Sequence, residues 1–159
     1  MTKIASATRA TTAEAVQDAP GSVITLLTDT AELTCNTATF EEGAVGAPPH
    51  FHTKATEFFH VTEGRLDVLV GDEVQTLDAG DFIAIPPGVK HAFAPAPGHT
   101  ASVFVGFTPG MDRFDYYRLL GRVFAGEATV QDIKDSSATY DNHYAESAAW
   151  SGRRRSAEP

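Results

Sequence analysis

The sequence has little cysteine, few basic residues and no long apolar run. Its single cysteine, Cys35, excludes an internal disulfide and a CxxC redox or zinc motif. One unpaired cysteine fits a reducing compartment, and we expect a cytoplasmic protein. Because no run of about 18 apolar residues occurs, we expect no membrane span. Only 12 Lys and Arg stand against 21 Asp and Glu, and the resulting charge of −9 argues against nucleic acid and anionic lipid as partners.

The two ends of the chain differ in composition from its middle. Residues 1–21 are rich in Ala and Thr, lack the apolar segment of a secretory signal and close with Pro20-Gly21. We expect an N-terminal arm here, either loosely ordered or adding a strand to a second subunit. Residues 146–159 contain three adjacent arginines on an acidic chain, and we expect a solvated, flexible tail rather than a nucleic-acid site.

In the middle of the chain, residues 22–108, apolar and polar residues alternate over short segments that are separated by Gly, Pro and Asp. This pattern is typical of an all-β sandwich, jelly roll or small barrel. We expect a turn at Glu63-Gly64 and another at Gly71-Asp72, where glycine supplies a positive φ. The predicted strands are Val23–Leu27, Leu33–Phe40, Glu57–Thr62, Arg65–Val70, Glu73–Leu77, Phe82–Ile85, His91–Ala94 and Ala101–Thr108.

After Pro109-Gly110 the spacing of apolar residues changes from that of a strand to that of a helix. Apolar side chains recur at helical spacing from Met111 to Ala125, which predicts an amphipathic helix that covers an apolar surface. A second short helix is expected over Thr129–Asp135. The domain division is therefore an arm (1–21), a β-barrel (22–108), a C-terminal helical segment (109–145) and a tail (146–159).

His50, His52 and Glu57 lie close together in the sequence, and His91 follows in a different predicted strand. His50 and His52 lie two residues apart, so in an extended segment both imidazoles point to one face and converge on one metal ion. Glu57 begins the next strand and can close on the same point. His60 has the opposite parity to Glu57, and we exclude it from the site.

The spacings around these residues are more specific than the His-x-His pair. They read His50-x-His52-x4-Glu57-x6-Gly64, followed by Gly80-x5-Pro86-x-Gly88-x2-His91. The two blocks resemble the two motifs of the cupin superfamily, with Ala44 where the first motif opens on glycine and Pro95 where the second closes on asparagine. Neither of those two positions is a metal ligand.

The resemblance implies a single-domain cupin, that is, a small jelly-roll barrel or double-stranded β-helix. It also implies a divalent metal held by His50, His52, Glu57 and His91. Such a ligand set leaves positions open for a substrate or dioxygen. Nitrogen-rich ligation without thiolate fits Fe, Mn, Ni, Co, Cu or Zn, and the sequence does not choose among them.

Two segments resemble quercetin 2,3-dioxygenase-like cupins in particular. They are the strand that contains Glu57 and the stretch Pro109–Phe114 with its helix, together with the later Tyr140-Asp141. This resemblance implies a second role for Glu57, as the base that takes a proton from a substrate hydroxyl before dioxygen attacks the ring. The expected partners are a small, aromatic substrate and dioxygen.

Four aromatic residues are candidates for the substrate pocket. Phe59 shares the strand face of Glu57, and Phe93 shares that of His91. Phe114 and Tyr117 close the mouth if their helix lies across it. For each of them, plain core packing is the competing interpretation.

Three functions remain open from the sequence. The first is a dioxygenase of a flavonol-like or other enolisable aromatic substrate. The second keeps the metal without oxygen, as a cyclase, isomerase or dehydratase of a polyketide-like metabolite. The third is a non-catalytic, small-molecule-binding cupin. The resemblance further implies a homodimer, to which the arm of residues 1–21 can contribute.

Overall fold

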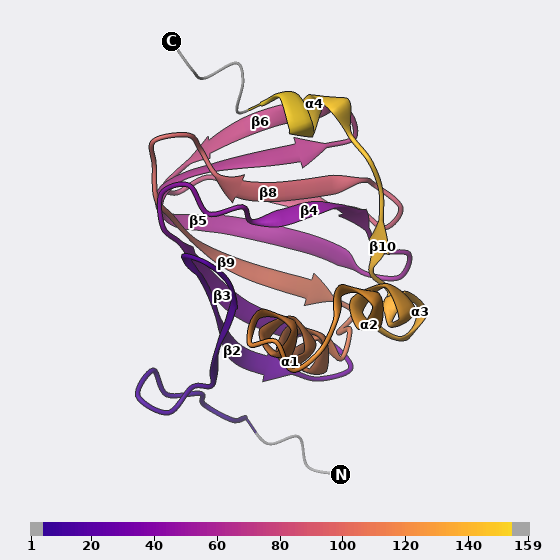
Figure 1. Ribbon diagram of the computed structural model, residues 1–159. Coiled ribbons are helices and arrows are strands. Elements are labelled where there is room, and N and C mark those ends of the chain that lie inside the picture. Colours follow the sequence, from indigo (N-terminus) through magenta and orange to yellow (C-terminus); the bar gives the residue numbers. More distant parts are fainter. Residues whose placement is uncertain (1–4, 154–159) are drawn as a thin grey trace.

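The computed structural model describes residues 5–153 (Figure 1). The first four residues of the expected arm and the end of the arginine-rich tail, residues 154–159, lie outside the described residues. None of the described helices combines the length and the apolar character that crossing a bilayer requires.

Within residues 5–153, ten strands form one curled antiparallel sheet in the order β1-β2-β3-β9-β5-β8-β4-β10, with β6 and β7 also paired to β5. The strands are β1 Ala15–Ala19, β2 Ser22–Asp29, β3 Thr34–Phe40, β4 Ala47–Phe51, β5 Thr56–Val70, β6 Glu73–Asp78, β7 Phe82–Ile85, β8 His91–Pro95, β9 Ala101–Thr108 and β10 His143–Tyr144. The helices are α1 Arg113–Phe124, α2 Val130–Asp135, α3 Ser137–Tyr140 and α4 Ala148–Gly152. The predicted all-β jelly-roll barrel with C-terminal helices is confirmed.

The expected turn at Glu63-Gly64 is wrong. Both residues lie inside β5, which runs unbroken for 15 residues. The first half of β5 pairs with β7 and β9, and the second half pairs with β6 and β8, with a register shift between Val61 and Glu63. Gly64 does have the positive φ, 72°, and a Cβ there would lie 2.0 Å from the carbonyl oxygen of Thr100. The glycine therefore bends the strand from one part of the sheet to the other instead of reversing it.

The main core lies inside the curl of the sheet. Its side chains come from alternate positions of the strands, as the period of two requires. Phe59, Leu66, Val103 and Phe107 are among its fully buried members.

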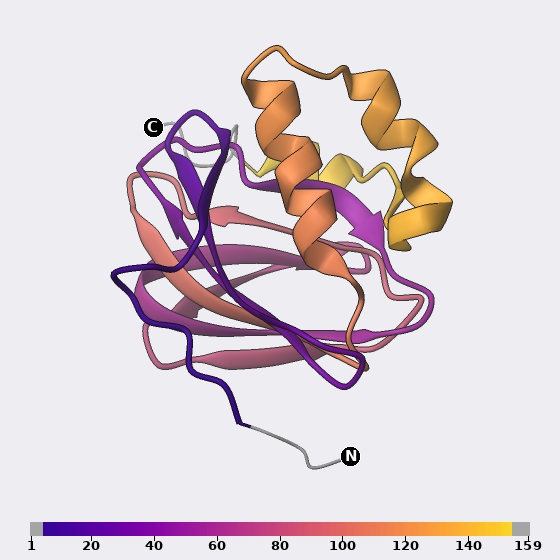
Figure 2. The same ribbon diagram turned by 90° about the horizontal axis from the view of Figure 1, so that it is seen from below.

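Helix α1 closes one side of the barrel (Figure 2). It packs on β1 and β2, where Tyr116 and Tyr117 meet the side chains of Ile24 and Leu26. The start of the helix is capped from the sheet, because the backbone N–H of Phe114 donates to Asp29 Oδ2 at 3.1 Å. β1 thus belongs to the sheet of its own chain, and exchange of the arm with a second subunit stays a prediction.

Candidate metal centre

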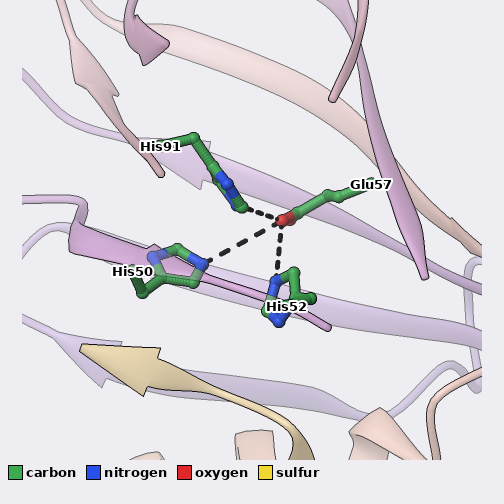
Figure 3. A group of neighbouring side chains, drawn as sticks. All are labelled: His50, His52, Glu57 and His91. Carbon is green, nitrogen blue, oxygen red and sulfur yellow. Dashed lines mark hydrogen bonds and ion pairs between the residues drawn. The ribbon is translucent and has the colours of Figure 1, made fainter. Parts of the chain in front are cut away.

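Four side chains from three neighbouring segments of the sheet converge on one point (Figure 3). His50 lies in β4 directly opposite His91 of β8, in a cross-strand pair. His52 follows the end of β4, two residues after His50, and Glu57 is the second residue of β5. The alternation of the strands aims all four groups to the inside of the barrel.

The four side chains of the cluster lie close together and are buried. Glu57 Oε2 lies 2.6 Å from Nε2 of His91, 3.0 Å from Nε2 of His52 and 4.0 Å from Nε2 of His50. One ligand atom from each residue falls within 4.8 Å of all the others. None of the four residues is more than 3% exposed.

The other nitrogen of each imidazole faces a backbone carbonyl oxygen, which can only accept a hydrogen bond. Each Nδ1 therefore carries the proton and donates, and each Nε2 holds a lone pair directed at the centre. The pairs are His50 Nδ1 to Pro48 O at 2.7 Å, His52 Nδ1 to Asp141 O at 2.7 Å and His91 Nδ1 to Val89 O at 2.9 Å.

This donor set fits a divalent cation. Three lone pairs and a carboxylate oxygen face one another inside a buried site, and they repel unless a positive charge lies between them. Without an ion, a proton takes that place. Burial would lower the pKa of His91, but the carboxylate of Glu57 raises it overall, while burial lowers the pKa of His50 well below its usual value. Burial would raise the pKa of Glu57, but His91 and His52 hold it well below its usual range.

A cavity of about 280 Å³ adjoins the cluster, and His50 and Glu57 are among the residues that line it. Its wall is mostly apolar and comes from the inner face of the sheet on one side and from α1 on the other. A wider depression of about 670 Å³ lies between β6 and α4, and none of the four cluster residues lines it.

The four aromatic candidates occupy different places. Phe93 and Tyr117 line the cavity. Phe59 is fully buried in the main core, with its ring 4.7 Å from that of Phe93 and 6.4 Å from that of His91. Phe114 packs against the cluster of α1, β1 and β2 and does not line the cavity. The substrate-binding role of these residues stays a prediction.

The remaining histidines lie apart from the centre. His60 and His99 are exposed, and His143 is one-third exposed and stacks on Phe51 with ring centroids 5.2 Å apart.

Asp141 supports the centre from outside, a role that the sequence did not predict. Its carbonyl oxygen fixes His52, and its carboxylate accepts from the backbone N–H groups of Thr53 and Lys54 at 2.9 and 3.0 Å. Burial would raise the pKa of Asp141, but the hydrogen bonds from Thr53 and Lys54 lower it overall. Asp141 therefore anchors the segment that carries His52.

Arg113 and Asn142 also line the cavity, and sequence reasoning missed both. A signal for Arg113 was present, because it lies three, four and seven residues before Tyr116, Tyr117 and Leu120, on the buried face of α1. An arginine on an apolar helix face is unusual enough to mark a site. Asn142 follows α3 in an irregular segment and has no comparable signal.

Comparison with known proteins gives one family and several related folds. Residues 36–106 match the model of the cupin domain. Over 49 residues, or 30% of this chain, the sequence is 47% identical to "Oxidoreductase OpS7" of Beauveria bassiana, and the match spans 16% of the length of that protein. KdgF from Halomonas sp. is similar in structure, with a TM-score of 0.62 and 26% identity over 69% of this chain and 97% of that one. An RmlC-like cupin from Shewanella frigidimarina gives a TM-score of 0.59 and 22% identity over 73% and 99% of the two chains.

Proposed function

We propose that this chain, which contains a cupin domain, is a metal-dependent dioxygenase of a flavonol-like or other enolisable aromatic small molecule. One observation carries the proposal: a buried cluster of three imidazoles and a carboxylate opens on an apolar, aromatic cavity. The local similarity to a protein named as an oxidoreductase supports it.

The residues that would hold the metal are His50, His52, Glu57 and His91. A bound ion of Fe, Mn, Ni, Co, Cu or Zn would supply Lewis acidity and, for the redox-active metals, electron transfer. The hydrogen bonds at the three Nδ1 atoms hold the imidazoles in the tautomer that a metal requires.

Glu57 is the residue that we assign as the general base. The histidines keep it ionised at neutral pH, so it is ready to accept a proton from a hydroxyl of the substrate. Its position at the edge of the cavity brings the carboxylate to the bound molecule. Loss of that proton converts the substrate into an enolate, which is the electron-rich form that reacts with dioxygen.

The apolar wall of the cavity binds the ring of the substrate and excludes water. Phe40 and Phe93, whose ring centroids lie 6.1 Å apart, contribute aromatic surface, and Val105 adds an aliphatic patch. A wall that excludes water strengthens the electrostatic interactions at Glu57 and protects a reactive enolate from being protonated again by solvent.

The first test is elemental analysis of the purified protein and of two histidine variants. We expect about one metal ion per chain in the wild type and in His60→Ala, and almost none in His50→Ala. His60 is the matched control because it is exposed and lies on β5 outside the cluster. Equal metal content in all three proteins would contradict the assignment of the ligands.

The second test is incubation of the metal-loaded protein with quercetin, with and without dioxygen. The dioxygenase consumes oxygen and cleaves the ring, and Glu57→Gln abolishes both. Absence of oxygen uptake with every first-row metal would remove this substrate class. Turnover that needs no oxygen would reassign the site to a cyclase, isomerase or dehydratase, and tight binding of an unchanged ligand would indicate a binding protein.

A further inference from the structure

A buried positive charge belongs to Arg113, one of the residues that line the cavity. Arg113 is 4% exposed, and its guanidinium stacks over the ring of Tyr116 with Cζ 4.0 Å from the centroid. Nη2 donates to Asn142 Oδ1 at 2.7 Å, and Nη1 donates to the carbonyl oxygen of Tyr140 at 3.4 Å. Nε is buried and has no hydrogen-bond partner in the part of the chain that the structure describes.

This charge has no carboxylate partner within 4.0 Å among residues 5–153. Two acidic side chains do line the cavity, but both are otherwise engaged. Glu57 faces the three histidines. Asp18 accepts from Ser22 Oγ at 2.7 Å, and burial raises its pKa. Since a guanidinium does not lose its proton in a protein, the buried charge of Arg113 is left uncompensated.

Asn142 adds a second donor without a partner. Its Oδ1 accepts from Arg113, whereas its Nδ2 is buried and makes no hydrogen bond within the described residues. Two buried N–H donors, one of them charged, thus lack acceptors on two residues that line the same cavity. Buried donors are expected to be satisfied, and an acceptor that brings negative charge would satisfy both and balance the guanidinium.

We propose that the cavity recognises its substrate through an anionic oxygen group, a carboxylate or a phosphate, bound by Arg113 Nε and Asn142 Nδ2. The apolar body of the same molecule then extends along the cavity to His50 and Glu57, where the proposed chemistry takes place. The inference rests on the proposed function and narrows its substrate from flavonols to other enolisable aromatic molecules that carry a carboxylate or a phosphate, but the binding step itself requires no metal.

The test uses the metal-free protein and three probes of similar shape: benzoate, phenyl phosphate and neutral benzamide. Titration calorimetry should show that one of the two anions binds at least about tenfold more tightly than benzamide, as expected for hydrogen bonds between charged groups. The preferred anion identifies the group as a carboxylate or a phosphate. If neither anion binds more tightly than benzamide, the proposal is overturned, whatever the metal content and activity of the loaded protein.

Two variants of Arg113 in α1 test whether this residue causes the preference for an anion over benzamide. Arg113→Gln keeps an amide donor without the charge and should abolish the preference for the anion over benzamide. Arg113→Lys should retain part of the preference. Arg118→Gln is the matched control, because Arg118 lies on the same helix but is exposed and pairs with Glu14. A preference that survives in Arg113→Gln would assign anion binding to another group and overturn the proposal.

A measurement on the wild type decides the matter if Arg113→Gln fails to fold. In the 15N-labelled protein, the Nε–Hε resonance of Arg113 should shift on addition of the preferred anion and not on addition of benzamide. A bracing role alone, in which Arg113 only ties α1 to Tyr140 and Asn142, predicts no shift with either probe.

Discussion

The cavity has two ends that differ in what they lack. At the barrel end, each histidine is fixed by a hydrogen bond, and four electron-pair donors are directed at one point that needs a cation. At the helix end, Arg113 and Asn142 present buried donors that need an acceptor. The first end could hold one metal ion, whereas the second is the end that we propose recognises the substrate.

The two ends also differ in how they are held. His50 and His91 face each other across paired strands in the interior of the sheet, where neighbours on both sides set their positions. An exposed ion pair between Arg118 and Glu14 links helix α1 to the segment before β1, and such a pair contributes about 1 kcal/mol or less. We therefore expect substitutions at other sites in the protein to disturb the geometry of the barrel end less than that of the helix end.

The largest predicted effect is at Phe107, which touches both ends. Its ring centroid lies 5.6 Å from that of His52 and 5.4 Å from Cζ of Arg113, and it is fully buried. Phe107→Ala should lower the free energy of unfolding by about 3–5 kcal/mol, because it removes core packing and leaves a void. Urea unfolding measures the change.

The control for this prediction is Phe82→Ala. Phe82 is 60% exposed, and its loss should cost less than about 1 kcal/mol. If Phe107→Ala were as mild as Phe82→Ala, the two ends would not share a common packed wall, and each could be treated as independent.

The second prediction concerns the anchor behind His52. Asp141 has a positive φ of 49°, which alanine tolerates poorly, and its carboxylate holds the backbone of Thr53 and Lys54. Asp141→Ala should weaken metal binding about 10- to 100-fold, the usual effect of losing an outer-shell partner. Asp141→Asn should be milder because asparagine accepts this backbone conformation. A metal affinity that is unchanged in Asp141→Ala would show that the strands alone position His52.

The sequence predicted the barrel end better than the helix end. Strand parity pointed to His50, His52 and Glu57 as ligand candidates, and the resemblance to the cupin motifs implied the full set with His91. The structure brings the four side chains together. The expected helix over Met111–Ala125 appears as Arg113–Phe124. Such periodic patterns can be predicted from the sequence because the position of a residue in a strand or helix determines the face on which its side chain lies.

Features that depend on tertiary contacts could not be predicted from the sequence. β4 contains Pro48 and Pro49, which remove backbone donors and hide a strand that pairing with β8 and β10 nevertheless holds. The bend at Gly64 looked like a turn because positive φ alone does not distinguish a reversal from a bulge. Asn142 enters the cavity only because the chain returns after α3, and no local pattern encodes that return.

The third prediction is a pH dependence confined to the barrel end. In the metal-free protein burial would lower the pKa of His91, but the neighbouring Glu57 raises it overall, so His91 keeps its proton to a higher pH than an ordinary histidine. A metal requires the neutral imidazole, so metal affinity should rise with pH, by about tenfold per unit for one displaced proton, and level off above the pKa of His91. Calorimetry in buffers of different ionisation enthalpy should detect the released proton, and its absence near neutral pH would show that His91 is already neutral.

The smallest effect is expected at Tyr117, on the helix end. The side chain is 7% exposed, and its hydroxyl donates to Asn36 Oδ1 at 2.9 Å. Burial raises the pKa of Tyr117, so the hydroxyl remains a neutral donor throughout the physiological range. Tyr117→Phe should therefore cost about 1 kcal/mol of unfolding free energy, because Asn36 Oδ1 loses its donor in a buried setting.

The same variant shows whether the two ends are separable. Metal content in Tyr117→Phe should equal that of the wild type, since Tyr117 contacts none of the three histidines by any hydrogen bond in the described residues. Tyr144→Phe is the matched control: its hydroxyl pairs with that of Tyr116 but the side chain is 39% exposed, so water replaces the lost partner at a smaller cost. A loss of metal in Tyr117→Phe would mean that the helix end helps to shape the ligand cluster, and the division of the cavity into a cation end and an anion end would no longer hold.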